Sequence, residues 1–289
     1  MQNSGEAWPG NMNSRFSKLF MLFVFLTIKV ISKLLCKVEI RGQENIPHQG
    51  QVLFLLRHRS YLGVFLVETA MFYPWVLQNM AMFPMNVAKD KHVRAFEHLP
   101  VVGLSIGNWL TKHFNVLRLP EKAATSRETR SAIIDTEVKA LVDRPNCSLV
   151  LFLTGTRDKP GEEGLPDFLP GIGRIVAETL PKIVFVWDQD TAAVWPGGKK
   201  LPRLVIRWWH GIPILSRHRV VITISQPIDA NDPQATLQQI CGSQPIEKVG
   251  RPVATYLRDL CWAWAVQQHP ELENVAVANR PEVSEDISA

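Results

Sequence analysis

The chain has few cysteines and none of the compact motifs that mark a metal or nucleotide site. Its four cysteines, Cys36, Cys147, Cys241 and Cys261, lie far apart, without a CxxC pair and without histidines at metal-ligand spacing. This distribution argues against a structural zinc site and is typical of reduced, mostly buried thiols in a protein that faces the cytosol. The motifs GxGxxG and HExxH are absent, and PGGKK at 196–200 lacks the flanking residues of a phosphate loop. Nucleotide and metalloprotease chemistry therefore have no support in the sequence.

The composition also lacks the low hydrophobicity of a disordered chain. Of 289 residues, 46% are apolar and 20% are charged, which is ordinary for a folded protein with one large α/β domain or two small ones. The net charge of +5 suits an anionic partner: nucleic acid, a membrane surface or a phosphorylated small molecule. The basic residues do not gather on a helix with interleaved aromatic residues, so we expect no nucleic-acid partner.

No apolar run near the N-terminus reaches the about 20 residues that a membrane-spanning helix needs. Residues 19–28 (LFMLFVFLTI) contain only Thr27 as a polar residue, and the apolar pattern continues to Leu35 with two lysines in it. This pattern predicts an amphipathic helix within residues 1–36 that lies in the headgroup plane of a membrane. Four basic residues fall within an arc of about 60° on the helical projection: Arg15, Lys18, Lys29 and Lys33.

Two alternatives exist for this N-terminal helix. A signal peptide would need a small-residue cleavage site after the apolar run, and the sequence has none there. The second alternative is a helix that packs on the core of the domain. The high density of aromatic residues and the arc of basic residues argue against it.

From residue 37 onward, short apolar runs alternate with amphipathic segments, a pattern typical of a sheet with helices around it. We expect strands over residues 37–41, 51–56, 85–88, 114–119, 148–153, 183–187, 203–209 and 220–225. Helical patterns cover residues 61–72, 103–112, 126–142, 173–180, 234–241 and 246–268. The sequence therefore predicts a single α/β domain with a mixed, mostly parallel central sheet flanked by helices.

This domain is expected to cover residues 37–269, after the membrane-associating helix of residues 1–36. The tail, residues 270–289, holds five acidic residues against one arginine and few large apolar groups, which predicts a mobile acidic segment.

Four sets of short segments follow one another along the domain. They are RHRS at 57–60; VAKD at 87–90 with LPVVG at 99–103 and FNVLR at 114–118; FLTGTR at 152–157; and the apolar LPKIVFV at 180–186. Together these segments resemble the phospholipid/glycerol acyltransferase family, to which 1-acyl-glycerol-3-phosphate acyltransferase belongs. The resemblance covers roughly residues 38–226 and depends on the order and spacing of the segments.

The resemblance implies roles for six residues, because the family's first motif reads NHxSxxD, its second block ends in an arginine and its third motif reads FPEGTR. His58 matches the general base, and an imidazole with a pKa of about 6.5 suits that task at neutral pH. The alternative for a lone histidine is a cap at a strand end. The matching substrate-binding residues are Ser60, Arg118, Gly155, Thr156 and Arg157. The two arginines look suited to hold the phosphate of the acceptor, because a guanidinium presents forked donors.

The chain departs from the family pattern at several positions. Gly63 stands where the motif has the aspartate that orients the histidine, and in a serine-protease triad loss of this function costs on the order of 10⁴ in rate. Another acid must replace it or activity is low; by proximity to the motifs, the candidates are Glu68, Asp90 and Asp158. The other departures are Arg57 for asparagine, Leu153 and Thr154 for the Pro-Glu of the third motif, and Trp187 where the fourth motif commonly has proline.

What the resemblance implies is an O-acyltransferase. It would move a fatty acyl group from acyl-CoA or acyl-carrier protein, as co-substrate, to a hydroxyl of a lysophospholipid or glycerol phosphate lipid, with no cofactor and no metal. Its partners would be membrane lipid and the acyl donor, and its location the cytoplasmic face of a membrane. The alternative is a catalytically weakened relative that serves as a lipid-binding or regulatory module. A soluble protein of unrelated function, with accidental motif similarity, is a third possibility.

Overall fold

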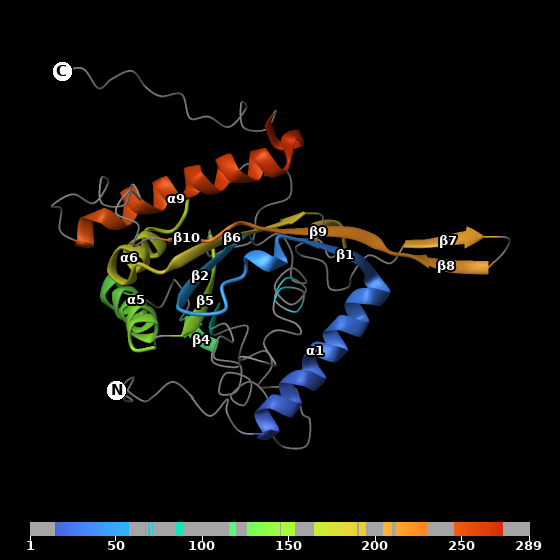
Figure 1. Cartoon of the computed structure of the whole chain (residues 1–289), viewed down its shortest axis with the longest axis horizontal. Helices are drawn as coiled ribbons and strands as arrows, with labels where there is room; N and C mark the ends of the chain where they lie inside the picture. Colours follow the sequence, from blue (N-terminus) through green and yellow to red (C-terminus); the bar gives the residue numbers. More distant parts are fainter. Residues whose placement is uncertain are drawn as a thin grey trace.

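The computed structural model describes the chain over residues 15–57, 67, 69, 71, 85–89, 116–119, 126–144, 146–153, 165–189, 191–194, 205–209, 212–229 and 246–273. Within these residues, an eight-stranded sheet carries helices on both of its faces (Figure 1). Helix α1 (Arg15–Leu35) lies on one face, and helices α5 (Arg127–Val142), α6 (Pro170–Thr179) and α9 (Ile246–Gln268) lie on the other.

The strands of this sheet follow the order β1-β9-β6-β2-β5-β3-β4, with β10 paired to β6. Five neighbours, β6, β2, β5, β3 and β4, are mutually parallel; β9 and β10 are antiparallel to β6, and β1 is parallel to β9. The predicted mixed, mostly parallel sheet is thereby confirmed. The strand bounds are β1 (Cys36–Arg41), β2 (Gln51–Leu56), β3 (Met85–Lys89), β4 (Val116–Leu119), β5 (Cys147–Phe152), β6 (Lys182–Gln189), β9 (His218–Ile224) and β10 (Ile228–Asp229).

Strands β2 and β6 lie in the interior of the sheet, and alternate residues of each pack into different layers. Phe54 and Leu56 belong to the core cluster on the α1 face, whereas Leu53 and Leu55 belong to the cluster under α6 and α9. A strand buried on both faces reads as a continuous apolar run, which is why QVLFLL (51–56) predicts a strand.

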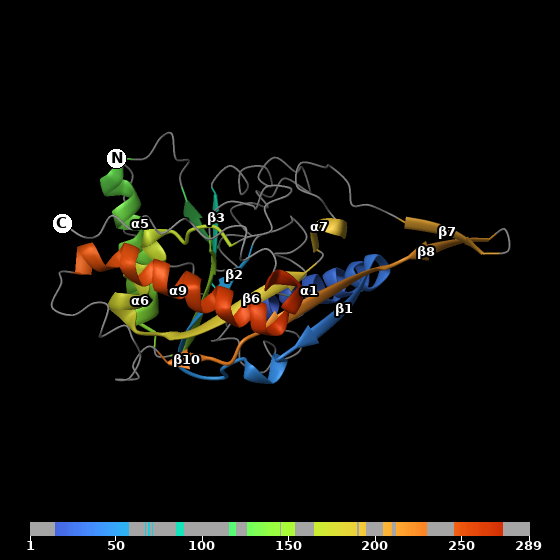
Figure 2. The same cartoon turned by 90° about the horizontal axis from the view of Figure 1, so that it is seen from above.

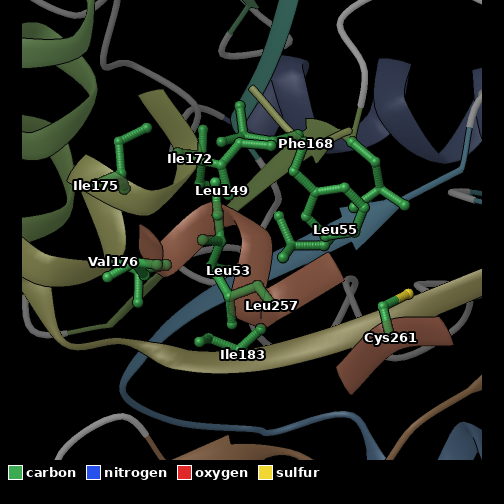
Figure 3. Packing of buried hydrophobic residues seen from close by; sticks show 14 of the residues in the cluster. Leu53, Leu55, Leu149, Phe168, Ile172, Ile175, Val176, Ile183, Leu257 and Cys261 are labelled. Carbon is green, nitrogen blue, oxygen red and sulfur yellow. The ribbon is translucent and has the colours of Figure 1, made fainter. Parts of the chain in front are cut away.

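The core under α6 and α9 is apolar throughout its visible part (Figure 3). Side chains of β2, β5 and β6 meet side chains from both helices there, and they interdigitate without a polar group among the labelled residues. The labelled residues are Leu53, Leu55, Leu149, Phe168, Ile172, Ile175, Val176, Ile183, Leu257 and Cys261. Helix α9 contributes five buried residues to this cluster, so the C-terminal helix is part of the domain core: Val249, Val253, Ala254, Leu257 and Cys261.

Two glycines allow α6 and α9 to cross at close range. A Cβ added to Gly173 would lie 2.0 Å from the carbonyl oxygen of Gly250 and 2.7 Å from the amide nitrogen of Ala254. A Cβ on Gly250 would lie 2.7 Å from the carbonyl oxygen of Pro170. The backbones of the two helices therefore pack directly against each other, and any side chain at position 173 separates them.

Helix α1 packs on the domain through the side that carries Phe25. Phe25 is 5% exposed and belongs to the core cluster on its face of the sheet. The end of the helix is fixed to β9, because Arg217 donates a hydrogen bond from Nη1 to the carbonyl oxygen of Lys33 at 3.1 Å. The alternative in which this helix packs on the core of the domain therefore holds for the side that carries Phe25.

The opposite side of α1 carries a row of exposed apolar side chains. Taking 100° per residue, these four residues lie within about 60° of one another, and the row faces away from the buried Phe25. They are Leu19 (67% exposed), Phe23 (65%), Leu26 (41%) and Val30 (58%). Among the described helices, none combines the length and continuous apolar character that crossing a bilayer requires.

The predicted elements agree with the structure wherever it describes them, and each predicted strand ends within two residues of the observed one. Helix α6 begins at Pro170 rather than at 173, since proline is well placed in a first helical turn. The predicted helices at 103–112 and 234–241 lie outside the described residues, as does most of 61–72. Residues 67, 69 and 71 of the last are helical.

Two strands were not predicted. Strand β8 (Ile212–Ser216) pairs with β7 (Val205–Trp209), whereas the predicted strand here ended at residue 209. The two-residue β10 is too short to leave a pattern. Strands β7 and β8 form a hairpin that extends beyond the end of the main sheet in both views (Figures 1 and 2). The side chains of this hairpin, Trp208 and Trp209 included, lie outside the described residues.

We predict that Gly173→Ala lowers the free energy of unfolding by about 2 kcal/mol or more, because the new methyl group meets backbone atoms that cannot move aside. Urea unfolding followed by tryptophan fluorescence measures the change. Gly171→Ala is the matched control on the same helix. Its Cβ meets only the flexible end of Ile134, at 2.9 Å, so its effect is expected to stay within about 1 kcal/mol. Equal effects of the two variants would contradict the close helix crossing.

Candidate functional site

The carboxyl ends of the five parallel strands lie along one edge of the sheet, which is where ligands bind in open α/β sheets. Two hydrogen bonds fix the chain as it leaves the strands there. The amide of Arg57, the residue after β2, donates to the carbonyl oxygen of Val186 at 3.4 Å, and the amide of Leu153, after β5, donates to Leu56 at 3.0 Å. The segments that follow β2 and β5 therefore begin side by side at this edge.

Most of the predicted site residues lie outside the described residues: His58, Ser60, Gly155, Thr156 and Arg157. His58 directly follows Arg57, and the third motif directly follows the buried Leu153. For Arg118 the structure describes the backbone, which pairs with Ala88 of β3 within strand β4, but not the side chain. Gly63, Glu68, Asp90, Thr154 and Asp158 also lie outside the described part.

Arg57 is buried at this edge, with 4% of its surface exposed. Its guanidinium carbon lies over the ring of Trp187, 4.5 Å from the ring centroid. A cation over an indole face gains electrostatic attraction, and the gain is larger when water is excluded. Two departures from the family pattern, at positions 57 and 187, are thus in direct contact on adjacent strands.

Trp187 links this edge of the sheet to the C-terminal helix. Its ring lies 6.1 Å from that of Trp262 on α9 at an interplanar angle of 58°, and 6.4 Å from that of His269 at 28°. Aromatic pairs at such separations stabilise a fold beyond the area they bury. Arg57, the residue before the predicted base, is therefore held by a side chain that packs against the end of α9.

His269 is buried between β9 and the short helix η5 (Pro270–Leu272), with which the predicted acidic tail begins. Its Nε2 lies 3.2 Å from Thr223 Oγ1, and its Nδ1 lies 3.5 Å from the carboxylate of Glu271. Burial lowers the pKa of His269, and this effect outweighs the opposing influence of Glu271. The folded protein therefore holds this imidazole in its neutral form.

Asp188 is a buried acidic group at this edge, with 1% of its surface exposed. Its Oδ2 accepts a hydrogen bond from the hydroxyl of Thr191, the first residue of α7 (Thr191–Val194), which is fully buried. In strand β6 it follows Trp187, so it lies on the opposite face of the sheet, the face of Val184 and Val186. On its β9 side, Asp188 pairs with the buried Ile222.

A model of the family described as Acyltransferase matches residues 37–189 of the chain. The chain belongs to this acyltransferase family. The match begins in β1 and ends at the last residue of β6, so it includes the strand edge described above. The resemblance predicted from the four ordered segments is confirmed.

A solved structure supports the same fold for this acyltransferase. The crystal structure of the 1-acyl-sn-glycerophosphate (LPA) acyltransferase PlsC from Thermotoga maritima aligns with a TM-score of 0.54 and 16% sequence identity. The alignment covers 89% of this chain and 85% of that one. A search of curated proteins found no match to this chain.

Sequence reasoning missed both Asp188 and the contact between Arg57 and Trp187. The signal for Asp188 was a single acidic residue at the end of the apolar run IVFVWDQ (183–189). This residue can be connected with the end of β2 only when β6 is known to lie beside β2. The neighbours of a strand in a parallel sheet cannot be predicted from one sequence. The acids that the sequence favoured, Glu68, Asp90 and Asp158, lie outside the described residues.

We predict that acidification destabilises this acyltransferase through His269. The pKa of His269 is lowered in the folded state, so as the pH falls through about 6.5 the unfolded chain binds a proton that the folded chain does not, and stability decreases. Thermal unfolding between pH 8 and pH 5 should show this loss, and His269→Gln should reduce the slope. Identical slopes in the wild type and in His269→Gln would refute the assignment.

Proposed function

We propose that this acyltransferase moves a fatty acyl group from acyl-CoA or acyl-carrier protein to a hydroxyl of a lysophospholipid or glycerol phosphate lipid. His58 takes the proton of the acceptor hydroxyl as the oxygen attacks the thioester carbonyl. The new carbon–oxygen bond forms, the carbon–sulfur bond breaks, and the departing thiolate takes the proton from His58. No metal or cofactor is needed for this exchange of an ester for a thioester.

The observation that carries the proposal is the shared edge of β2, β5 and β4. The base motif follows β2, the GTR segment of Gly155, Thr156 and Arg157 follows β5, and Arg118 lies near the end of β4. Neighbouring strands are about 4.8 Å apart, so β2 and β4, three spacings apart, are separated by roughly 14 Å. An arginine side chain and an acceptor with its phosphate can together bridge this separation. Ser60 would bind substrate beside the base.

Membrane association at the cytoplasmic face is part of the proposal. The exposed apolar row of α1 suits the acyl region of a bilayer, and Lys29 and Lys33 lie beside the row, where they would meet anionic headgroups. Three cysteines, Cys36, Cys147 and Cys261, are buried free thiols. Burial raises the pKa of the first two to about 11, which keeps them protonated and unreactive and suits a reducing compartment.

The first test is acyl transfer by the purified protein. With lysophosphatidic acid and labelled acyl-CoA or acyl-carrier protein, we expect labelled phosphatidic acid, and His58→Ala should lower the rate by about 10²–10⁴-fold, the usual contribution of a general base. Arg118→Ala and Arg157→Ala should mainly raise the KM of the acceptor. His48→Ala, which removes an exposed histidine in a turn, should leave the rate unchanged.

The same assay separates the proposal from its alternative. Binding of lysophosphatidic acid without turnover, with both acyl donors, would indicate a lipid-binding module. Turnover that survives His58→Ala would also count against the proposed mechanism.

A second test addresses the membrane. Flotation with vesicles of phosphatidylglycerol and phosphatidylcholine should recover the wild-type protein, and Phe23→Asp should weaken vesicle binding at least tenfold, since one large apolar side chain contributes about 1.5–3 kcal/mol. The matched control is Val142→Asp, which changes a residue 55% exposed on α5, a helix that lies away from α1 in Figure 1. Equal flotation of the two variants would disprove docking through α1.

A further inference from the structure

We propose that a cluster of basic residues at the junction of α1, β1 and β9 binds the headgroups of anionic phospholipids. This junction cluster consists of Lys33 on α1, Lys37 on β1, Arg217 just before β9, and Arg219 on β9. The inference rests on the proposed function, in which α1 docks on a membrane. It adds that the sheet itself contacts the lipid surface, and that this contact selects anionic lipid.

Positive charge is concentrated on the three elements that meet at this junction. The sequences of α1, β1 and β9 together contain seven lysines and arginines and one acidic residue, Glu39. The helices α5, α6 and α9 together also contain seven lysines and arginines, but these accompany six acidic residues. The basic excess of the chain therefore belongs to one part of the molecule, as expected for a surface that attracts an anionic partner.

The fold brings the four residues of the junction cluster together. Helix α1 ends at Leu35 and β1 begins at the next residue, so Lys33 and Lys37 lie on either side of the joint. Arg217 donates a hydrogen bond from Nη1 to the carbonyl oxygen of Lys33 at 3.1 Å. Lys37 and Arg219 are Cα partners on neighbouring parallel strands, about 4.8 Å apart. All four residues of the cluster are exposed.

The junction cluster extends around the corner of the sheet. Cys36 and Val38 contribute to the core on the α1 face, so alternation along β1 puts Lys37 on the opposite face. Arg219 shares that face, because paired residues of neighbouring strands point to the same side. Lys33 belongs to the helix on the other side. A lipid surface that touches the end of α1 can therefore meet basic residues from both sides of this corner.

One carboxylate, that of Glu39, is shared between two guanidinium groups beside the cluster. Its Oε2 accepts a hydrogen bond from Nη2 of Arg219 at 2.6 Å, and its Oε1 accepts one from Nε of Arg41 at 2.8 Å. The hydrogen bonds from Arg219 and Arg41 lower the pKa of Glu39, which keeps it ionised at neutral pH. Lys37 and Arg219 are like charges on directly paired residues and repel each other. A bound anionic headgroup would relieve this repulsion.

Continuity with the exposed apolar row of α1 makes a lipid surface the partner that fits. Val30, the last residue of the row, lies three residues before Lys33, which is less than one helical turn. Strand β1 then leaves the end of the helix at the same joint (Figure 1). Apolar side chains in the acyl region, with basic side chains beside them at headgroup level, are the arrangement by which interfacial elements bind anionic membranes. An acidic protein is the competing partner.

The test is the affinity of the full chain for vesicles of two compositions: phosphatidylcholine alone, and equal parts of phosphatidylglycerol and phosphatidylcholine. The double variant Lys37→Gln with Arg219→Gln should bind the anionic vesicles about tenfold or more weakly than the wild type, and the neutral vesicles equally well. The matched control is Lys248→Gln with Arg251→Gln, which removes the same charge from exposed positions on α9 and should change the affinity less than threefold. Equal affinities of the two double variants for anionic vesicles would overturn the inference.

Glu39→Gln gives a test of opposite sign, which stays informative should the double variant fail to fold. It removes the one carboxylate beside the cluster and keeps an amide oxygen that accepts from the two arginines. Binding to the anionic vesicles should become about threefold or more tighter, and more sensitive to added salt. Damage to the fold would instead weaken binding, so unchanged or weaker binding of this variant would count against the inference.

The outcomes separate this inference from the proposed function. If the wild type binds neither kind of vesicle, membrane docking through α1 and the junction cluster both fail, whatever the acyl-transfer assay shows. If Phe23→Asp weakens binding and the Lys37 and Arg219 double variant behaves like its control, docking stands and the inference alone fails. A double variant that binds vesicles like its control but needs tenfold more acyl-carrier protein for half-maximal rate would assign the cluster to a protein partner, and would also overturn the inference.

Discussion

The position of β2 between β5 and β6 is the constraint on which the rest of the molecule depends. Strand β2 pairs in parallel with both β5 and β6, so the carboxyl ends of all three strands lie at one edge of the sheet. Its buried side chains supply both core layers, which fixes the strand against sliding, since a shift by one residue would exchange the faces of all its side chains. The chain that leaves β2 at Arg57 is therefore delivered to a defined place and face.

The elements around β2 act mainly through this placement. The α6–α9 layer holds Leu53 and Leu55 from one side, and α9 also reaches the edge through Trp262, which packs on Trp187. In this way the C-terminal helix, which the family match at 37–189 does not include, supports the residue before the predicted base. The two departures from the family motifs, Arg57 and Trp187, contact each other. A tryptophan at position 187 gives the buried guanidinium of Arg57 an aromatic face to pack on.

The sequence allowed the strands to be predicted well, because buried parallel strands are continuous apolar runs and the helices between them are long and amphipathic. It also identified the family from ordered motifs. It did not allow the order of strands to be predicted, since β2 and β6 are far apart along the chain and nothing in either run names its neighbour. For the same reason the contact between Arg57, which follows β2, and Trp187 on β6 could not be predicted from the sequence. Strand β8 was not predicted, and its pairing with β7 is a further neighbour relation that a single sequence does not show.

The junction between α1 and β1 has a geometric consequence. The helix ends at Leu35 and the strand starts at Cys36, with no connecting residue between them, and Arg217 bonds the helix end to β9. The sheet therefore cannot swivel freely about the helix. A helix seated in the lipid surface would set the tilt of the whole sheet, and with it the height of the strand edge above the headgroups. Such a rigid mount would let an acceptor lipid present its hydroxyl while its tail remains in the bilayer.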